Sequence, residues 1–229
     1  MPNAYFTPAT LKFLQELEQN NRRDWFEDNR ARYEEQVRGP ALAFIGDMAP
    51  ELAAFAPRFL ALPKKVGGSL MRVHRDTRFG RDKTPYKTNI GIHFRHDAGK
   101  DVHAPGYYLH IAPDGCFLGV GIWRPDAEAL GRIRERLVEK PQQWLDARDA
   151  DAFRGAYALS GDALQNPPRG YAKDHPLLED LKRKDFIAIR ELKKKEVLSS
   201  TLPADAAGHF AAATPFMRFL CAALGVGFD

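Results

Sequence analysis

Cysteine is scarce in this chain. The only two, Cys116 and Cys221, are far apart in the sequence and outside any pair with metal-ligand spacing. Such sparse usage is typical of proteins from a reducing compartment, so we expect both thiols to be free and buried. The first residues, from Met1 to Pro8, contain neither the basic nor the apolar region of a secretory signal. These two features predict a cytoplasmic protein.

Long apolar runs and familiar catalytic motifs are also missing. The most apolar segment, residues 209–228, is interrupted by Pro215 and Arg218, which would be costly inside lipid. We therefore expect a buried C-terminal helix there and no membrane partner. The chain has no phosphate-binding Walker loop, no Gly-x-Ser-x-Gly elbow and no His-Glu-x-x-His helix. Common signatures therefore do not indicate an enzyme class.

Positive charge, by contrast, is concentrated in one segment, residues 72–87. The whole chain has 34 Lys and Arg against 30 Asp and Glu, a net charge of +4. The segment supplies that entire excess, because its six cations face only two carboxylates, Asp76 and Asp82. Clustered charge of one sign focuses electrostatic potential toward a ligand of the opposite sign. The six cations are Arg72, Arg75, Arg78, Arg81, Lys83 and Lys87.

Hydrophobic periodicity divides the chain into three regions. Residues 1–60 have helical spacing, with helices expected from Thr7-Pro8, from Asn21 as a cap to Gly39-Pro40, and over 41–56. Residues 66–123 alternate like strands, at 70–74, 89–95, 107–111 and 116–123, the last two joined by a turn at 113–115. Residues 125–229 are mainly helical (127–138, 141–148, 152–158 and from Thr214 to Gly225), with a fifth strand possible at 186–192. This order predicts one α+β domain around a mainly antiparallel sheet of about four to six strands, flanked by N- and C-terminal helices.

Alternation within the strands predicts two different sheet faces. Apolar residues occupy one face: Ile90, Ile92, Phe94, Tyr107, Leu109, Ile111, Leu118, Val120 and Ile122. The other face should collect Arg72, His74, Asn89, His93, Arg95, Tyr108 and His110, with Gly119 and Gly121 leaving an open floor between Phe117 and Trp123. Concave surfaces with a few polar groups and aromatic walls are typical of ligand sites.

The candidate site combines this floor with the basic segment, which we expect to form a loop over one end of the face. Pro85 should stiffen that loop and Gly80 should loosen it. Arginine can bind carboxylate or phosphate with two hydrogen bonds, and lysine adds a mobile charge. The candidate ligand-binding residues are Arg72, Arg75, Arg78, Lys83, Tyr86, Lys87, Tyr108, Gly119, Gly121 and Trp123.

Three hypotheses for function remain open. The first is binding of an anionic small molecule or a nucleic-acid backbone. The second is a hydrolase or transferase acting on a phosphorylated or acidic substrate, with Asp76 or Asp82 as acid or base. In the third, the segment is structural and the protein is a scaffold. The histidines at 74, 93 and 110 could in principle meet at a Zn²⁺ ion, but solvated strand histidines are commoner, so we predict no metal site. The sequence specifies neither a cofactor nor an oligomeric state.

A long set of residues carries a resemblance to one known family. Near the N-terminus these residues are Phe6, Leu11, Phe13, Leu14, Asn20, Asn21, Trp25, Phe26 and Tyr33. The hallmark is Arg72, Arg75, Asp76, Arg78, Phe79, Asp82, Lys83, Pro85, Tyr86, Lys87 and Thr88. Further matches are Gly106, Tyr107, Tyr108, Gly119, Gly121, Ile122, Trp123, Pro125, Arg134, Pro168, Arg169, Gly170, Tyr171, His175, Pro176 and Lys184. With these residues the chain resembles, over nearly its whole length, a family of conserved hypothetical proteins found mainly in bacteria, domain of unknown function 2461. That resemblance implies a single α+β domain and brings no activity, substrate or cofactor with it.

Overall fold

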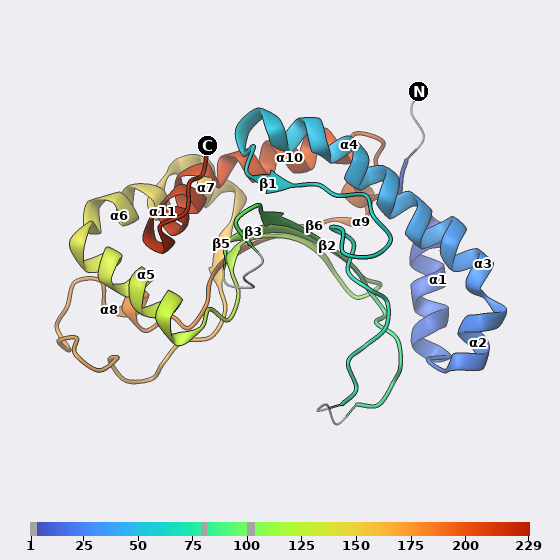
Figure 1. Ribbon diagram of the computed structural model, residues 1–229, viewed down its shortest axis with the longest axis horizontal. Helices are drawn as coiled ribbons and strands as arrows, with labels where there is room; N and C mark the ends of the chain where they lie inside the picture. Colours follow the sequence, from blue (N-terminus) through green and yellow to red (C-terminus); the bar gives the residue numbers. More distant parts are fainter. Residues whose placement is uncertain (1–3, 79–81, 100–103) are drawn as a thin grey trace.

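Six antiparallel strands form the central sheet, in the order β1-β2-β3-β4-β6-β5 (Figure 1). The computed structural model describes residues 4–78, 82–99 and 104–229. The predicted α+β class with a mainly antiparallel sheet is confirmed. The strands are β1 (Phe59–Leu60), β2 (Ile90–His96), β3 (Gly106–Ile111), β4 (Cys116–Ile122), β5 (Ala158–Ser160) and β6 (Phe186–Leu192).

Helices surround the sheet at both ends of the chain. The first group is α1 (Pro8–Gln19), α2 (Arg23–Asp28), α3 (Arg30–Tyr33), the π-helical turn η1 (Glu34–Arg38) and α4 (Gly39–Phe55). The second group is α5 (Ala127–Glu139), α6 (Pro141–Asp149), α7 (Asp151–Ala156), α8 (Leu178–Leu181), α9 (Lys194–Val197), α10 (Leu202–Ala212) and α11 (Thr214–Leu224). The apolar segment near the C-terminus thus contains the end of one helix and the whole of a second, separated at Ala213.

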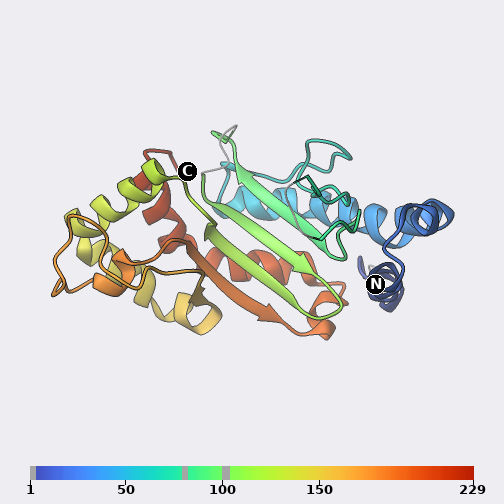
Figure 2. The same ribbon diagram turned by 90° about the horizontal axis from the view of Figure 1, so that it is seen from below.

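One face of the sheet forms the core and the other has no helix over it. Helices α4 and α10 lie across the first face (Figure 1). Seen from below, the strands lie in front of these helices, and no helix of the described residues covers them (Figure 2). All nine residues predicted for the apolar face are buried, at 2% exposure or less. The predicted turn at 113–115 is also confirmed, because it joins β3 to β4 in an antiparallel pair.

The strand predicted at 70–74 is wrong. The chain meets the sheet only around Leu70, which forms a bridge to Ile92. The Met71 amide donates to the Gly91 carbonyl at 2.9 Å, and the His93 amide donates to the Ser69 carbonyl at 2.8 Å. The chain then leaves the sheet, and His74 pairs instead with Tyr86 of its own segment. The short strand β1 occupies the rest of this edge, opposite the end of β2. The outer edge of β2 is therefore paired with two short segments, β1 and the residues around Leu70.

The predicted helix end at Gly39-Pro40 is also wrong, because helix continues from α3 through η1 into α4. A proline inside a helix leaves the carbonyl four residues earlier without a donor and crowds it. Here the backbone widens into the π-turn, in which the Gly39 amide donates to the Glu34 carbonyl. The orphaned Gln36 carbonyl accepts a hydrogen bond from the Thr10 hydroxyl at 2.7 Å. Helix α1 thus supplies the donor that Pro40 lacks.

Candidate functional site

The basic segment folds as an irregular hairpin at the β2 edge of the sheet, beside α1 and α2 (Figure 1). Its two arms are joined by backbone hydrogen bonds from Arg75 to Pro85 at 2.8 Å and from Lys87 to Val73 at 2.7 Å. We call these two arms, residues 72–78 and 82–87, the basic hairpin. Phe79, Gly80 and Arg81, which include one of the six predicted cations and the expected flexible glycine, lie outside the described residues.

A single asparagine attaches the basic hairpin to the N-terminal helices. The Asn21 side-chain amide donates to the Tyr86 carbonyl at 2.9 Å, and its oxygen accepts from the Tyr86 amide at 3.0 Å. The predicted helix-capping role of Asn21 is therefore wrong: its side chain is committed to the hairpin, and the N-cap of α2 is Arg22. The Tyr86 ring is 2% exposed and stacks on Phe26, with centroids 4.1 Å apart.

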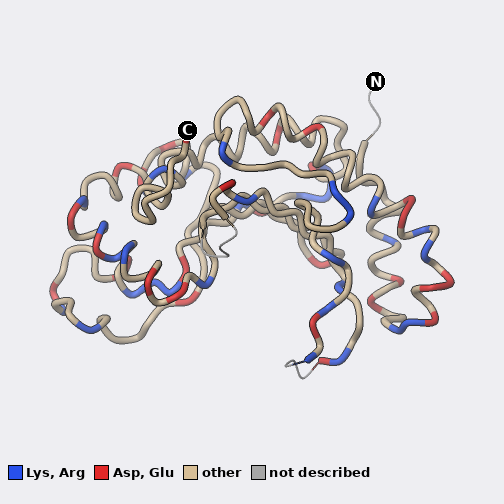
Figure 3. Tube along the Cα trace, in the orientation of Figure 1, with Lys and Arg blue, Asp and Glu red and all other residues tan. Residues whose placement is uncertain are grey.

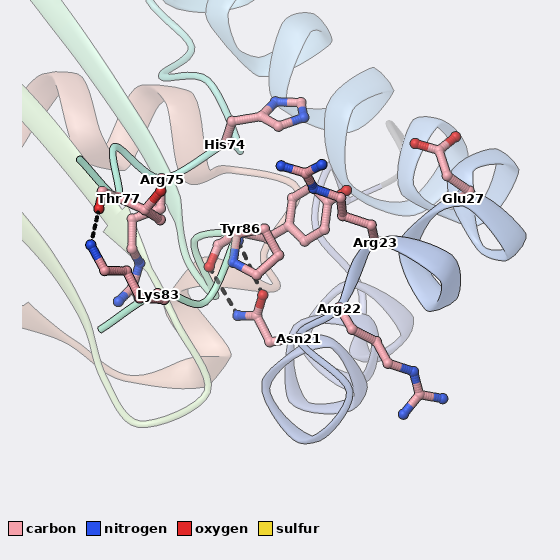
Figure 4. A pocket seen from close by; sticks show the side chains of 10 residues that line it. Asn21, Arg22, Arg23, Glu27, His74, Arg75, Thr77, Lys83 and Tyr86 are labelled. Carbon is pink, nitrogen blue, oxygen red and sulfur yellow. Dashed lines mark hydrogen bonds between the residues drawn. The ribbon is translucent and has the colours of Figure 1, made fainter. Parts of the chain in front are cut away.

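A pocket of about 520 Å³ opens between the basic hairpin and the turn from α1 to α2 (Figure 4). We call it the basic pocket. Cations reach it from two parts of the chain, and Figure 3 shows Lys and Arg on both the hairpin and that turn. The lining residues are Asn21, Arg22, Arg23, Glu27, His74, Arg75, Thr77, Lys83, Pro85 and Tyr86.

Sequence reasoning missed four of the ten lining residues: Asn21, Arg22, Arg23 and Glu27. The other six lie within the predicted segment, residues 72–87. The available signal was the pair Arg22-Arg23 at the start of α2, because the positive end of a helix disfavours cations. In Figure 4 the Arg22 side chain points away from the hairpin residues, and it pairs with Asp24 at 3.0 Å. Arg23 has no carboxylate partner among the described residues.

The two candidate catalytic carboxylates bond within the hairpin. Asp76 accepts two hydrogen bonds from the Arg78 guanidinium, at 2.7 and 3.0 Å, and the Arg78 side chain lowers the pKa of Asp76 far below its ordinary value. Asp82 accepts from the Thr84 amide at 2.9 Å and the Thr84 hydroxyl at 2.8 Å, and it pairs with Arg75. The Thr84 hydrogen bonds, backbone first, lower the pKa of Asp82. Both groups are therefore ionised at neutral pH.

The remaining described cations of the hairpin form no ion pairs with carboxylates among the described residues. Lys83 donates to the Thr77 carbonyl at 2.8 Å. Within the described part of the chain, Arg72 and Lys87 have no carboxylate partner. Burial, followed by the charges of Arg72 and Arg75, lowers the pKa of Lys87. Arg72, Arg75 and Lys87 therefore lie near enough for the two arginines to disfavour the charge of the lysine, an effect that a bound anion would offset.

Uncharged rings occupy the middle of the uncovered sheet face. Tyr108 leans across Gly91, where an added Cβ would lie only 2.7 Å from its hydroxyl. At Gly119 an added Cβ would make ordinary contacts, 3.7 Å from Tyr108 and 3.8 Å from Phe117. Burial lowers the pKa of His93 to about 4, with Arg95 adding to the effect, and lowers the pKa of His110. The imidazoles on this face are thus neutral at physiological pH.

Gly121 and Trp123 lie at the opposite end of the sheet from the basic hairpin. The hairpin leads into Ile90, which aligns through Ile111 with Cys116, whereas Trp123 follows the other end of β4. The length of β4 places these ends about 20 Å apart, at about 3.4 Å per residue. The single site predicted from the sequence is therefore divided into two regions.

Gly121 does not provide the floor that alternation predicted. Its φ is 109°, and an added Cβ would lie 2.0 Å from the Phe186 carbonyl oxygen. Glycine is required here because two backbones approach closely. Trp123 is 64% exposed, so its ring is accessible.

The described residues form neither a metal-binding cluster nor a membrane-spanning helix. Among the described residues, no three His, Cys, Asp or Glu side chains are placed to hold a metal ion together. His74 lies at the basic pocket, while His93 and His110 lie on β2 and β3. No helix within the described ranges has the length and apolar character needed to span a bilayer.

An antiparallel sheet with one helix-covered face, and an arginine-rich hairpin attached beside it, defines the structural class of this protein. The sequence profile of the conserved hypothetical protein family DUF2461 matches residues 9–219. Because the match covers most of the chain, the protein belongs to this family. No curated protein and no solved structure has significant similarity to it.

Proposed function

We propose that this protein binds a phosphorylated or otherwise anionic ligand in the basic pocket. The observation that carries the proposal is the convergence of cations from two separate chain segments, Arg23 from α2 and Arg75 and Lys83 from the hairpin, on one pocket. Guanidinium groups bind phosphate or carboxylate through charge-assisted hydrogen bonds. The pocket volume of about 520 Å³ lies within the range of small-molecule sites.

Binding explains the two aspartates better than acid–base catalysis does. A general acid or base works best with a pKa near the operating pH. Asp76 and Asp82 instead have lowered pKa values and bond to arginine or threonine groups of the hairpin. Their role in this proposal is to orient Arg78 and Arg75, whereas the enzyme hypothesis would need one of them to change protonation state.

We also place the protein in the cytoplasm as part of this proposal. Cys116 and Cys221 are both buried and unpaired. Free thiols are favoured in reducing compartments. A phosphorylated metabolite, a nucleotide or a nucleic-acid backbone would all be available there as ligands.

Calorimetric titration with pyrophosphate tests the proposal. Wild type should bind, and Arg23→Ala and Lys83→Ala should each weaken binding by about tenfold or more, the worth of a hydrogen bond to a charged group. Neither Arg23 nor Lys83 pairs with a carboxylate in the described ranges, so neither substitution leaves a carboxylate without its partner. Lys12→Ala, on an α1 side chain that is 73% exposed, is the matched control. Undetectable binding by wild type, or equal binding by all four proteins, would contradict the proposal.

A further inference from the structure

A strained turn presents an exposed tryptophan at the end of the sheet farthest from the basic pocket. Arg124 is the only non-glycine residue among those described with a positive φ, 50°. Its guanidinium carbon lies 4.7 Å from the centre of the Trp123 ring, which is 64% exposed. Most residues avoid this backbone conformation, and a glycine would adopt it without strain.

A buried carboxylate holds the turn in place. Asp185 is 3% exposed, and one of its oxygens accepts the Arg124 amide at 2.7 Å. Its other oxygen accepts the Asp162 amide at 2.9 Å. The surrounding structure therefore enforces a conformation that the local sequence disfavours, and such enforced strain is concentrated at functional sites. The feature that it maintains is an accessible aromatic ring beside a cation.

Between this turn and the basic hairpin lies the uncovered face of the sheet, and the basic pocket opens on the side of the hairpin that faces α2 (Figures 1 and 2). On β2, β3 and β4 its central side chains are rings without charge at neutral pH: Tyr108, Phe117 and the imidazoles of His93 and His110. On β6 the exposed Glu191 aligns with Phe117 and adds one carboxylate to the face. Positive groups thus lie beyond both ends of β4, which spans about 20 Å at about 3.4 Å per residue. A ligand that complements this pattern has repeated negative charges and flat rings, and it is long enough to reach both ends.

We propose that a single-stranded nucleic acid binds along this face, with a phosphate in the basic pocket and a base stacked on Trp123. The proposal rests on the proposed function, because the pocket is its phosphate anchor. Base stacking on aromatic side chains combined with a positive backbone track is the usual recognition mode for single strands. The Arg124 guanidinium is placed to bind the phosphate next to the stacked base.

The first experiment measures fluorescence anisotropy of labelled oligothymidylates of increasing length with the full chain. A strand that spans about 20 Å needs about six nucleotides at about 3.4 Å each, and fewer when it is extended. Affinity should rise steeply up to that length and then level off, and it should fall steeply with salt. Affinity that does not rise above that of dinucleotides, or equal affinity for a duplex of the same length, would overturn the inference.

The second experiment separates the turn from the pocket. Trp123→Ala should weaken binding of a ten-nucleotide strand by about 5- to 150-fold, the range expected for one stacked base, while Trp123→Phe should retain most of it. Arg124→Gly permits the positive φ, so its melting temperature should equal or exceed that of wild type while it binds the strand more weakly. Val138→Ala, at a 43% exposed apolar residue on α5, is the control.

Pyrophosphate distinguishes failure of this inference from failure of the proposed function. All three turn variants should bind pyrophosphate as wild type does, because the pocket lies at the other end of the sheet. If wild type binds pyrophosphate but the turn variants bind the strand unchanged, the inference fails and the anion pocket stands. If an acidic peptide competes with the strand at equal concentration, recognition is by charge alone and the inference fails.

Discussion

The Asn21 side chain forms hydrogen bonds with both backbone groups of Tyr86. One N–H of its side-chain amide donates to the Tyr86 carbonyl, and the side-chain oxygen accepts from the Tyr86 amide, as the N–H and C=O groups of a paired strand would. The Phe26 ring then stacks on the Tyr86 ring behind this contact. One wall of the basic pocket is therefore held against the other by a single polar residue and a ring pair.

Replacing Asn21 with alanine should destabilise the protein by about 1–3 kcal/mol, because two partly buried backbone groups lose their partners. Urea denaturation should show this as a lower midpoint with an unchanged slope. Asn166→Ala, at an exposed asparagine in a loop, is the matched control. If the Asn21→Ala protein were as stable as the control, the Asn21–Tyr86 hydrogen bonds would not be what holds the hairpin to the helices.

His93 predicts a specific dependence of stability on pH. Burial lowers its pKa from 6.5 to about 4 in the folded protein. Between these values the unfolded chain binds a proton that the folded protein does not, so stability falls as the pH is lowered through this window. The loss should reach at most about 3 kcal/mol by pH 4.

Urea denaturation at about pH 7 and about pH 4.5 measures this effect. His93→Gln, which cannot titrate, should reduce the loss of stability on acidification. The exposed His74, replaced in the same way, is the matched control. If the His93→Gln protein loses as much stability as wild type over this interval, His93 is not the group responsible.

At the scale of elements, the π-turn η1 connects helices α3 and α4 across Gly39-Pro40, where the sequence predicts a helix end. Gly39 and Pro40 are a usual end of a helix, yet helical structure runs from Arg30 to Phe55 without a break. Two features remove the obstacle: the wider turn at residues 34–38, and the Thr10 hydroxyl that bonds the Gln36 carbonyl. Helix α1 is thereby fixed to the start of α4, and the turn that follows α1 carries Arg22 and Arg23 to the pocket.

A double-mutant cycle between Thr10 and Pro40 tests this account. Thr10→Val should cost about 1–3 kcal/mol, because the nearly fully buried Thr10 no longer bonds the Gln36 carbonyl. With Pro40→Ala, an amide becomes available to that carbonyl, so the added cost of Thr10→Val should shrink. Denaturant unfolding of the four proteins gives the coupling energy. Strictly additive effects would show that the hydroxyl does not replace the missing amide.

At the scale of the whole molecule, the sheet separates two positively charged features. The basic pocket lies beside the β2 edge, between the hairpin and α2, whereas the Trp123–Arg124 turn lies at the far end of β4. Helices α4 and α10 cover only the other face (Figure 1). The layer arrangement thus leaves the sheet face between the basic hairpin and the Trp123–Arg124 turn without a helix from the described residues over it (Figure 2).

Ligand binding should stabilise the whole fold, because the pocket walls come from segments that are distant in the sequence. At about 100 times the dissociation constant, a ligand that binds only the folded state adds about 2.7 kcal/mol. For a chain of this size that corresponds to a rise in melting temperature of about 5–10 °C. Differential scanning calorimetry with pyrophosphate measures the rise. Lys83→Ala should show a smaller rise at the same concentration, and a rise equal to that of wild type would argue against binding in the pocket.

The sequence by itself determined the local features of this protein. Strand alternation identified the buried face from Ile90 to Ile122, and the charge excess located the basic hairpin. Both follow from short-range rules, because neighbouring side chains point to opposite faces and charges are counted directly. The start of α1 and the end of α11 were also readable from their Pro and Gly signals.

Only the tertiary structure decided which of these features meet. The Asn21 side chain bonds to Tyr86, 65 positions away, and Thr10 supports a carbonyl 26 positions away. The same packing brings Arg23 to Arg75 and Lys83, and it moves Trp123 to the far end of the sheet. Local propensity contains no information on such pairings, because hydrogen bonds between distant groups depend on how whole elements pack. A helix-stop signal and a capping asparagine were therefore misread, while the residue types themselves were read correctly.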